Sequence, residues 1–498
     1  MPVDIKTLFN RRNRFIWFMA IILLPLFFIN VRSSHDWGGD FAMYIMQAKN
    51  IVEGVPQTEV SYIYNPDNPV IGPPAYPIGF PLLLSPVYAL AGNSIFAFSL
   101  WITAFLFGTG MIMALYLRRY FTELVAFFLV MILMYNPWTL GMKLEIMSEF
   151  PFAFLLMLCL YLFEKYAGGP FWMGIVIAFV GGLLMSVRTI GVVFPIAVLI
   201  WAIRKRFIEK DKTPMSRCVC GFLVGVGSIL VYLLLNNILF VVPQAEGGSY
   251  AGIWGEEKLY YTILFNLAYY TEQFKYFFSP WGGSWNFLPL ILKAVIFTFT
   301  LLGMIRAFFK RLELIDMIVI LYMGVLLIYP YRHAGIRFLF PIMPLLVYYL
   351  AKGLETVSIF PAIRNNAKVW FLGCLVLVSY LHMFWIIIDT RHEVVKGPQE
   401  KSSVEAFEYI RNNTEKEDVI IFSKPRVLAL YAERSSLANH KELGTREIAE
   451  LIFEHDVDYV LTHTEISDQA IHDFIRSQDY ICEYLWSNEK FVLYKVVL

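Results

Sequence analysis

The sequence is short of charge. Only 16% of its 498 residues are Asp, Glu, Lys or Arg, whereas 58% are hydrophobic. Soluble domains average about 25% charged and about 45–50% apolar residues. A chain of this composition cannot hide its apolar surface from water in an ordinary soluble fold, so most of it must lie in lipid. The formal net charge is only +1 and no basic face stands out, so a nucleic-acid partner is not expected.

Cysteine is scarce as well. Of the five cysteines, four lie in or beside long apolar runs, and Cys482 stands alone in the C-terminal part of the chain. A disulfide framework is therefore excluded there. The Cys218 and Cys220 pair has no nearby metal-ligating partners, which argues against a zinc centre at that position.

Long apolar runs dominate what is present. A membrane-spanning helix needs roughly 20 predominantly apolar residues, and we identify about eleven candidates. They lie near residues 15–31, 94–117, 121–138, 148–163, 172–187, 189–203, 217–241, 286–309, 314–330, 338–351 and 369–388. A further apolar stretch, 73–92, is interrupted by five prolines and predicts an interfacial or re-entrant segment, because proline disrupts a lipid-exposed helix.

Lysine and arginine are concentrated in every second connection, beginning with the N-terminal segment. The positive-inside rule then places the N-terminus in the cytoplasm and everything after the eleventh span outside. The first apolar run is too long for a signal peptide and lacks a small-residue cleavage site, so we interpret it as an anchor. The expected protein is a multi-pass integral membrane protein, as in a bacterial inner (plasma) membrane.

The composition changes at residue 389. Short apolar runs at 418–423, 457–463 and 491–497 alternate with helical patterns, which is typical of a small α/β domain. This tail holds no Gly-rich phosphate loop and no cluster of nucleophiles. We therefore predict two domains: an α-helical membrane domain over 1–388 and a soluble, extracytoplasmic α/β domain over 389–498.

Two acids follow the first span in the stretch HDWGGDFAMYIMQAKNIVEG. From Gly39 onward, apolar residues recur at helical spacing, which predicts an amphipathic helix on the membrane surface. Asp40 lies in its first turn, where a carboxylate is favoured by the helix N-terminus. It is either a helix-capping charge or a reactive group, and Asp36 is either solvated or an orienting group for a substrate.

The stretch NPWTLGMKLEIMSEFPFAF opens another outer connection. Ser148 and Glu149 precede Pro151 in the arrangement of a helix cap. Glu145 and Glu149 are also four residues apart, so on a helix both carboxylates would face the same cavity. We include Lys143 and Glu145 among the candidate groups that orient an acceptor or substrate.

Cations collect on the same outer side. Arg188 lies in SVRTIG between two closely spaced spans, and an arginine at membrane depth is either functional or reaches for lipid phosphates. A second outer loop, YPYRHAGIRFLFPIMPLL, contains Arg332, His333 and Arg337. Arginine presents a fork of donors that suits a phosphate, so these four residues are the predicted phosphate-binding group.

Carboxylates and phosphate-binding arginines beside lipid suit group transfer from a lipid-linked phosphate donor. An acid can deprotonate the hydroxyl of an acceptor. The arginines would neutralise the charge that develops on the leaving phosphate.

The chain resembles the GT-C superfamily of polytopic glycosyltransferases, specifically the family-39-like members related to protein O-mannosyltransferases and lipid A aminoarabinose transferases. The resemblance covers about residues 10–390 and rests on the order of five motifs. They are GGDFAMYIMQAKNIVEG, YPIGFPLLLSPVYALAG, SEFPF, SVRTIG and RFLFPIMPLL.

This resemblance implies an inverting transfer of a sugar from a polyprenyl-phosphate carrier to a glycolipid such as lipid A, a glycan or a protein. By position, Asp40 would be the catalytic base, and Arg188 and Arg337 would contact the phosphate. Glu149 would orient the acceptor or a catalytic residue. The mannosyltransferases carry adjacent Asp-Glu where this chain has Asp40-Phe41, which weakens the case for a protein acceptor. The superfamily's oligosaccharyltransferase branch uses a divalent metal, whereas members with monophosphate donors generally do not. No cofactor is therefore expected, and a divalent metal near Asp36 and Asp40 or Glu145 and Glu149 is the alternative.

Two other interpretations remain open. In a lipid or solute transporter the carboxylates would bind protons or substrate, although the chain shows no internal repeat of the kind common in transporters. A transferase of another group, such as phosphoethanolamine, would need a nucleophile and metal ligands in a large outer domain, and the tail contains neither.

Overall fold

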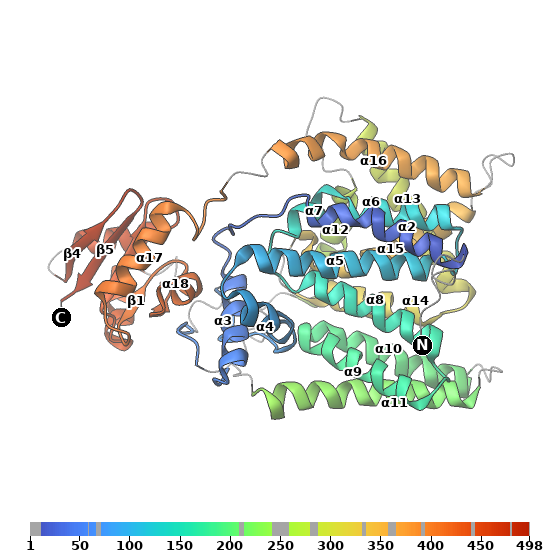
Figure 1. Ribbon diagram of the computed structural model, residues 1–498, viewed down its shortest axis with the longest axis horizontal. Coiled ribbons are helices and arrows are strands. Elements are labelled where there is room, and N and C mark those ends of the chain that lie inside the picture. The colour runs from blue at the N-terminus through green and yellow to red at the C-terminus, as the bar shows by residue number, and fades with distance from the viewer. Residues whose placement is uncertain are drawn as a thin grey trace, which may run out of the picture. The chain divides into compact units, whose positions relative to one another are not determined.

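The computed structural model describes residues 11–57, 59–65, 71–208, 214–241, 258–278, 287–330, 335–356, 365–389, 394–439, 444–478 and 481–497. These residues form two compact units (Figure 1). The first unit comprises Met1–Val31, Ser99–Leu235 and Trp254–Arg391, and the second Arg32–Phe98, Asn236–Ile253 and His392–Leu498. The unit that contains the C-terminal tail thus also contains residues 32–98, which we call the first outer connection after the predicted topology.

All regular secondary structure among the described residues of the first unit is helical. Its principal helices are α2 (Arg11–Leu23), α5 (Ile95–Leu117), α6 (Glu123–Met134), α7 (Pro137–Met142), α8 (Glu149–Tyr166), α9 (Phe171–Val187), α10 (Val193–Ile203), α11 (Met215–Leu233), α12 (Leu259–Phe277), α13 (Phe287–Lys310), α14 (Leu314–Ile328), α15 (Met343–Thr356) and α16 (Asn365–Asp389). Helices α9, α10 and α11 pack side by side (Figure 1). Short 3-10 segments, among them η1 (Leu24–Phe27), η3 (Thr189–Val192), η6 (Gly335–Phe338) and η7 (Phe340–Ile342), begin or end several of these helices.

Each of the eleven expected apolar runs coincides with a helix of this unit. Within the described residues, three helical stretches are long and apolar enough to cross a membrane by themselves, namely Ile95–Leu117, Met215–Leu239 and Ile291–Lys310. Shorter apolar helices account for much of the remainder. The prediction of a helical membrane domain is therefore confirmed at the level of its helices, and the number of spans stays a prediction.

Helices α13 and α15 approach closely where Gly303 faces Gly353. A Cβ atom added at Gly303 would overlap the carbonyl oxygen of Tyr349, and one added at Gly353 would overlap that of Phe299. Small residues at helix crossings let backbones come together in membrane proteins, where dispersion contacts replace the hydrophobic driving force.

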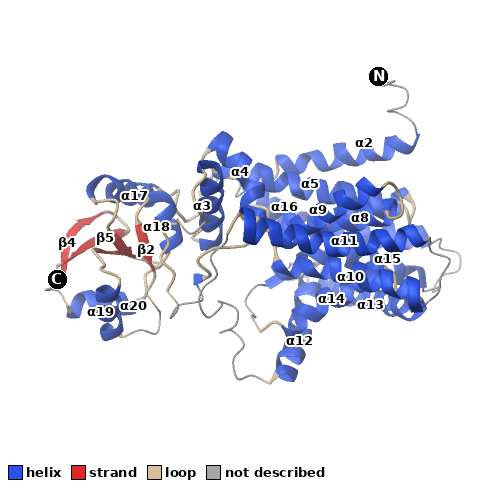
Figure 2. Cartoon of the chain, turned by 90° about the horizontal axis from the view of Figure 1, so that it is seen from below, coloured by secondary structure: helices blue, strands red, loops and turns tan. Residues whose placement is uncertain are grey.

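The second unit contains a five-stranded sheet of order β2-β1-β3-β5-β4. Strands β1 (Val419–Ile421), β2 (Ser435–Leu437) and β3 (Tyr459–His463) are parallel, while β4 (Cys482–Ser487) and β5 (Phe491–Val496) complete an antiparallel edge. Figure 2 shows the sheet between α17 (Lys401–Asn413) and α18 (Pro425–Ala432) on one face and α19 (Thr445–Glu454) and α20 (Gln469–Ser477) on the other. The predicted α/β tail is confirmed.

Helical spacing of apolar residues explains how α19 and α20 bind the sheet. Ile448, Leu451 and Ile452 of α19, together with Ile471 and Phe474 of α20, are buried in one hydrophobic cluster with strand residues. The opposite face of the sheet buries aromatic rings. The indole of Trp37 lies 6.1 Å from the ring of Phe422 and 6.3 Å from that of Phe491. Residues of the first outer connection are therefore part of the core of this unit.

The first connection also extends the sheet. The backbone N–H of Ile63 donates to the carbonyl of Ser436, and the N–H of Ser436 donates to the carbonyl of Ser61, at 2.9 and 2.8 Å. Tyr62 thereby pairs in parallel with Ser436 on the outer edge of β2. This pairing covers an edge strand that would otherwise present unpaired backbone groups.

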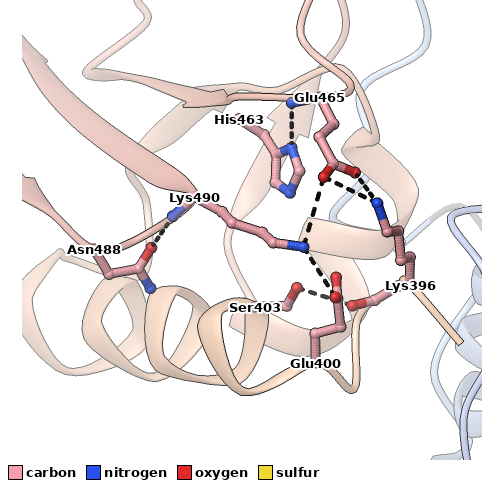
Figure 3. Close-up of polar contacts among 8 residues, drawn as sticks. Lys396, Glu400, Ser403, His463, Glu465, Asn488 and Lys490 are labelled. Atoms are coloured by element: carbon pink, nitrogen blue, oxygen red, sulfur yellow. Dashed lines mark hydrogen bonds and ion pairs between the residues drawn. The ribbon is translucent and has the colours of Figure 1, made fainter. Parts of the chain in front are cut away.

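A polar network lies on the tail (Figure 3). Lys490 binds Glu400 at 3.0 Å and lies 3.9 Å from Glu465, which also binds Lys396 at 3.0 Å. The Nδ1 atom of buried His463 accepts a hydrogen bond from the N–H of Glu465. Burial lowers the pKa of His463, and the positive charge of Lys490 lowers it further.

The close crossing of α13 and α15 predicts that Gly353→Ala will destabilise the protein by about 1–3 kcal/mol, because the added methyl overlaps a helix backbone. The matched control is Gly324→Ala in α14, where no atom lies within 4 Å of the added Cβ. That variant should be neutral, or more stable by up to about 1 kcal/mol. Denaturant unfolding in detergent checks both variants, and equal shifts would contradict the packing argument.

The lowered pKa of His463 predicts that the protein loses stability in mild acid. Because its pKa is lowered in the folded state, the unfolded chain takes up the proton first as the pH falls below about 6.5, and stability is lost over that range. His463→Asn keeps a hydrogen-bond acceptor but does not titrate. Its melting temperature should fall less than that of the wild type between about pH 7.5 and about pH 5.5. His472→Asn, on α20, serves as the control and should behave like the wild type.

Candidate functional site

Asp40 lies in the first turn of α3 (Gly39–Glu53), in the second unit. The predicted helix forms, but the residues from Phe41 to Ala48 are all buried. Helices α4 (Gly79–Ala91) and α18 pack against it. The helix is therefore packed within protein along most of its length, and its position at the membrane surface stays a prediction.

The carboxylate of Asp40 takes part in a side-chain cluster. Its Oδ1 atom accepts a hydrogen bond from the hydroxyl of Tyr76 at 2.7 Å and lies 3.5 Å from Nη1 of Arg426. The residue that caps α3 is Gly38. Asp40 remains 33% exposed, so it is both held in place and accessible.

Tyr76 is oriented by the same helix that carries Asp40. The amide of Gln47 binds the Tyr76 backbone twice, accepting from its N–H at 3.0 Å and donating to its carbonyl at 2.9 Å. The ring of Tyr44 packs on the ring of Tyr76 at 4.5 Å. Asp40, Tyr44 and Gln47 follow the helical period and so share one face of α3. Burial raises the pKa of Tyr76 well above its ordinary value, so its hydroxyl stays protonated and donates.

Arg426 is the member of this cluster that the sequence does not reveal. It comes from α18 in the tail, is 1% exposed, and donates to the hydroxyl of Tyr76 at 3.0 Å and to the carbonyl of Pro73 at 2.5 Å. Its guanidinium also lies 4.9 Å from the ring centre of Tyr62. Burial works against its charge, but Tyr76, Tyr62 and Asp40 outweigh that effect and raise the pKa of Arg426. The signal in the sequence is a single arginine within an otherwise apolar helix.

Glycine makes room for this arginine. Gly72 has a φ of +103°, and a Cβ atom at this position would lie 2.6 Å from Nη2 of Arg426. Any other residue would be strained by that φ and would also displace the guanidinium.

Asp36 lies just before α3, and its side chain binds the backbone at the start of that helix. Its Oδ1 atom accepts from the N–H of Gly38 at 2.8 Å and lies 3.0 Å from Nδ1 of His35. Burial works to raise the pKa of Asp36, but the contacts with His35 and Gly38 outweigh it and the pKa is lowered.

A second cluster lies in the first unit around Glu149, the first residue of α8. Glu149 is 1% exposed, and its Oε1 atom binds Nη1 of Arg188 at 2.8 Å and Nε of Arg337 at 3.1 Å. The two arginines remain 20% and 33% exposed. Two guanidinium groups that repel one another are therefore held together by one shared, buried carboxylate.

Neighbouring groups fix the direction of Arg188. The hydroxyl of Ser148 accepts from its Nη1 at 3.0 Å, and the ring of Phe338 lies 5.1 Å from its Cζ. Two partly exposed guanidinium groups, both oriented by one buried carboxylate, can donate to an anion such as a phosphate.

One expected feature of this region does not form. Glu145 and Glu149 are not on one helical face, because α8 begins at Glu149 and Glu145 lies in a bend. The ammonium group of Lys143 is buried, lying 3.0 Å from the carbonyl of Leu26 and 3.4 Å from the hydroxyl of Thr103. It links helices within the unit. Arg332 and His333 lie outside the described residues.

Comparison with known proteins identifies the fold. Neither a protein-family model nor a curated protein sequence matches the chain. Among solved structures, ArnT from Cupriavidus metallidurans bound to undecaprenyl phosphate matches with a TM-score of 0.57 and 11% identity, over 97% of this chain and 98% of ArnT.

Two further structures match over nearly the whole of this chain. The oligosaccharyltransferase of Archaeoglobus fulgidus has a TM-score of 0.54 and 13% identity, with 99% of this chain and 75% of that protein covered. The arabinofuranosyltransferase AftD from Mycobacteria has a TM-score of 0.54 and 10% identity, and this chain spans 42% of its length. These neighbours are GT-C glycosyltransferases. The chain has the fold of the GT-C superfamily of membrane glycosyltransferases.

Proposed function

We propose that this protein is an inverting glycosyltransferase that moves a sugar from a polyprenyl-phosphate-linked donor to an acceptor at the outer face of the membrane. The observation that carries the proposal is the sharing of buried Glu149 by Arg188 and Arg337. This arrangement keeps two partly exposed guanidinium groups in place, where they can donate to a phosphate. The acceptor is a glycolipid such as lipid A, a glycan or a protein.

The arginines suit the leaving group of such a reaction. When the bond between the anomeric carbon and the phosphate oxygen breaks, the electron pair leaves with the polyprenyl phosphate, which gains a negative charge. Preorganised donors aimed at that charge stabilise the transition state more than the ground state. Glu149 acts as a positioning residue, because it holds both arginines without itself being exposed.

Asp40 is the proposed catalytic base. It takes the proton of the acceptor hydroxyl while the acceptor oxygen forms its bond to the anomeric carbon, on the face opposite the departing phosphate. A single displacement of this kind inverts the configuration. Tyr76 and Arg426 both donate to Oδ1 of Asp40, and we assign them the role of positioning the carboxylate.

Similar proteins bind ligands of this class. The ArnT structure contains undecaprenyl phosphate, and the oligosaccharyltransferase AglB from Archaeoglobus fulgidus is in complex with an inhibitory peptide and a dolichol-phosphate. These ligands support a polyprenyl-phosphate donor for the present chain. We further propose the topology predicted from the basic residues: an integral protein of a bacterial inner membrane, its N-terminus cytoplasmic and its tail outside. The reaction needs no metal ion, because Arg188 and Arg337 meet the phosphate charge.

The test uses the full-length protein in detergent with a panel of polyprenyl-phosphate sugars. Mass spectrometry measures the release of free polyprenyl phosphate with and without candidate acceptors. Wild-type protein should release it in the presence of EDTA, whereas Asp40→Asn should lose at least about 100-fold in rate, the contribution typical of a general base. Asp473→Asn, an exposed carboxylate on α20, is the control and should retain full activity.

Further measurements distinguish a glycosyltransferase from a transporter. Arg337→Gln should raise the KM for the donor, since it removes a group assigned to phosphate binding. Unaltered release by Asp40→Asn would remove Asp40 from the mechanism. If no donor is consumed, but lipid still crosses proteoliposome membranes in a manner that depends on Arg188 and Arg337, the protein is a transporter.

Arg426 predicts an effect on turnover rather than on donor binding. Arg426→Gln should lower kcat by about 10- to 100-fold, the cost of a lost charge-assisted hydrogen bond, with the KM for the donor unchanged. Arg426→Lys keeps the charge and should recover part of the activity. Arg434→Gln is the matched control. Arg434 is also a buried arginine of the tail, 8% exposed, but it binds Arg411 and Thr414. A kcat loss as large in Arg434→Gln would mean that Arg426 acts only through stability.

A further inference from the structure

A pocket of about 400 Å³ lies in the first unit. It is formed by the connection between α5 and α6, the start of α6, and residues of α15 and α16. Its volume is within the range of about 300–1,000 Å³ that is usual for small-molecule sites. It is lined by Arg119, Tyr120, Phe121, Thr122, Val125, Ala351, Glu355 and Val369. None of these residues has a role in the proposed transfer reaction.

Charges of both signs are fixed at this pocket. Arg119 binds Glu164 of α8 through Nη1 at 3.2 Å. Lys352 of α15 binds Glu355 at 3.3 Å, and its ammonium lies 4.8 Å from the ring centre of Phe121. Of these four groups, Arg119 and Glu355 line the pocket itself, and their formal charges cancel. A ligand that matches them carries no net charge but presents both a negative and a positive group.

The surroundings are those of a membrane–water boundary. Trp370 and Phe371 of α16 and Leu124 of α6 are exposed close to the pocket in sequence. Tryptophan is enriched at the level of lipid headgroups, and exposed apolar side chains beside it suit acyl chains. Lys368 and Arg118 belong to the same ends of the helices, which is the side that the basic residues assign to the cytoplasm.

An apolar notch of only about 10 Å³ lies beside the polar pocket, between the same three helices. It is lined by Phe128, Leu129, Ile132, Leu350, Leu354, Val369, Leu372 and Gly373. Val369 lines both the pocket and the notch. On α6 the notch lies one to two turns beyond Val125, away from the charged end. The notch is too small for an acyl chain, but a polar recess beside the exposed side chains of Leu124, Trp370 and Phe371 has the layout of a phospholipid site.

We propose that this pocket binds the headgroup of a zwitterionic phospholipid that carries a phosphate and a primary ammonium, as phosphatidylethanolamine does. The phosphate lies against Arg119 and Lys352, whose guanidinium and ammonium groups donate to its oxygens. The ammonium of the lipid donates to Glu355, and the acyl chains lie against the exposed side chains of Leu124, Trp370 and Phe371. The site is a binding site for a structural lipid and is separate in chemistry from the sugar donor.

The test measures the thermal stability of delipidated, full-length protein in detergent as single lipids are added back. Phosphatidylethanolamine should raise the melting temperature of the wild type, and phosphatidylglycerol, which lacks the ammonium, should do so at least about tenfold less potently. Phosphoethanolamine without acyl chains should have no effect at the same concentration. An equal effect of phosphoethanolamine would show a soluble-phosphate site and overturn the assignment to lipid.

Two variants test the site itself. Arg119→Gln combined with Lys352→Gln should weaken the effect of phosphatidylethanolamine by at least about tenfold, because the lipid phosphate loses two charge-assisted hydrogen bonds. Thr122→Phe fills the pocket without changing a charge and should also remove the effect. The control combines Arg306→Gln and Lys310→Gln on α13, two exposed positions with the same change in charge.

The control double variant should respond to phosphatidylethanolamine as the wild type does. If both site variants also keep the full response, the lipid binds elsewhere and the proposal is wrong. It is equally wrong if phosphatidylglycerol stabilises the wild type as well as phosphatidylethanolamine does. None of these measurements uses sugar transfer, so they stand whether or not the proposed enzymatic function is correct.

Discussion

The burial of one guanidinium group organises the second unit. Removing a charge from water costs several kcal/mol unless polar and charged groups of the protein replace the lost hydration. Arg426 meets this condition through Tyr76, the carbonyl of Pro73 and the carboxylate of Asp40. Because its partners come from the first outer connection and the arginine comes from the tail, satisfying the charge joins these two parts of the sequence. The position of the Tyr76 hydroxyl, and with it the orientation of Asp40, depends on that requirement.

The same physical arrangement recurs in the first unit with the signs reversed. Arg426 is a buried cation behind a partly exposed carboxylate, whereas Glu149 is a buried carboxylate behind two partly exposed guanidinium groups. In each case the buried charge holds the exposed one without competing for a ligand. Preorganisation of this kind matters for catalysis, since groups that are already oriented need not reorganise as charge develops.

The sequence predicts the features that depend on local composition and spacing. Every expected apolar run forms a helix, and the alternating pattern of the tail forms an α/β sheet. Features that depend on long-range contacts were not predictable. Nothing near Arg426 indicates Asp40, which is 386 positions away, and nothing in residues 61–63 indicates that they pair with β2. The candidates Glu149, Arg188 and Arg337 were expected on one side of the membrane domain, but a single chain cannot show that they share one oxygen atom. Glu145 failed as a helical neighbour of Glu149 because α8 begins only at Glu149.

The pairing of residues 61–63 with the edge of β2 has a consequence for how the protein is made. Synthesis runs from the N-terminus, so α3 and the segment after it leave the ribosome long before Ser436 and Arg426 exist. Until the tail has been translated and delivered to the same side of the membrane, Asp40 has neither its arginine nor the strand contact that fixes Tyr62. A nascent or truncated chain therefore contains every helix of the first unit while its Asp40 cluster is still unformed. Biogenesis itself delays that cluster until the last part of the chain is in place.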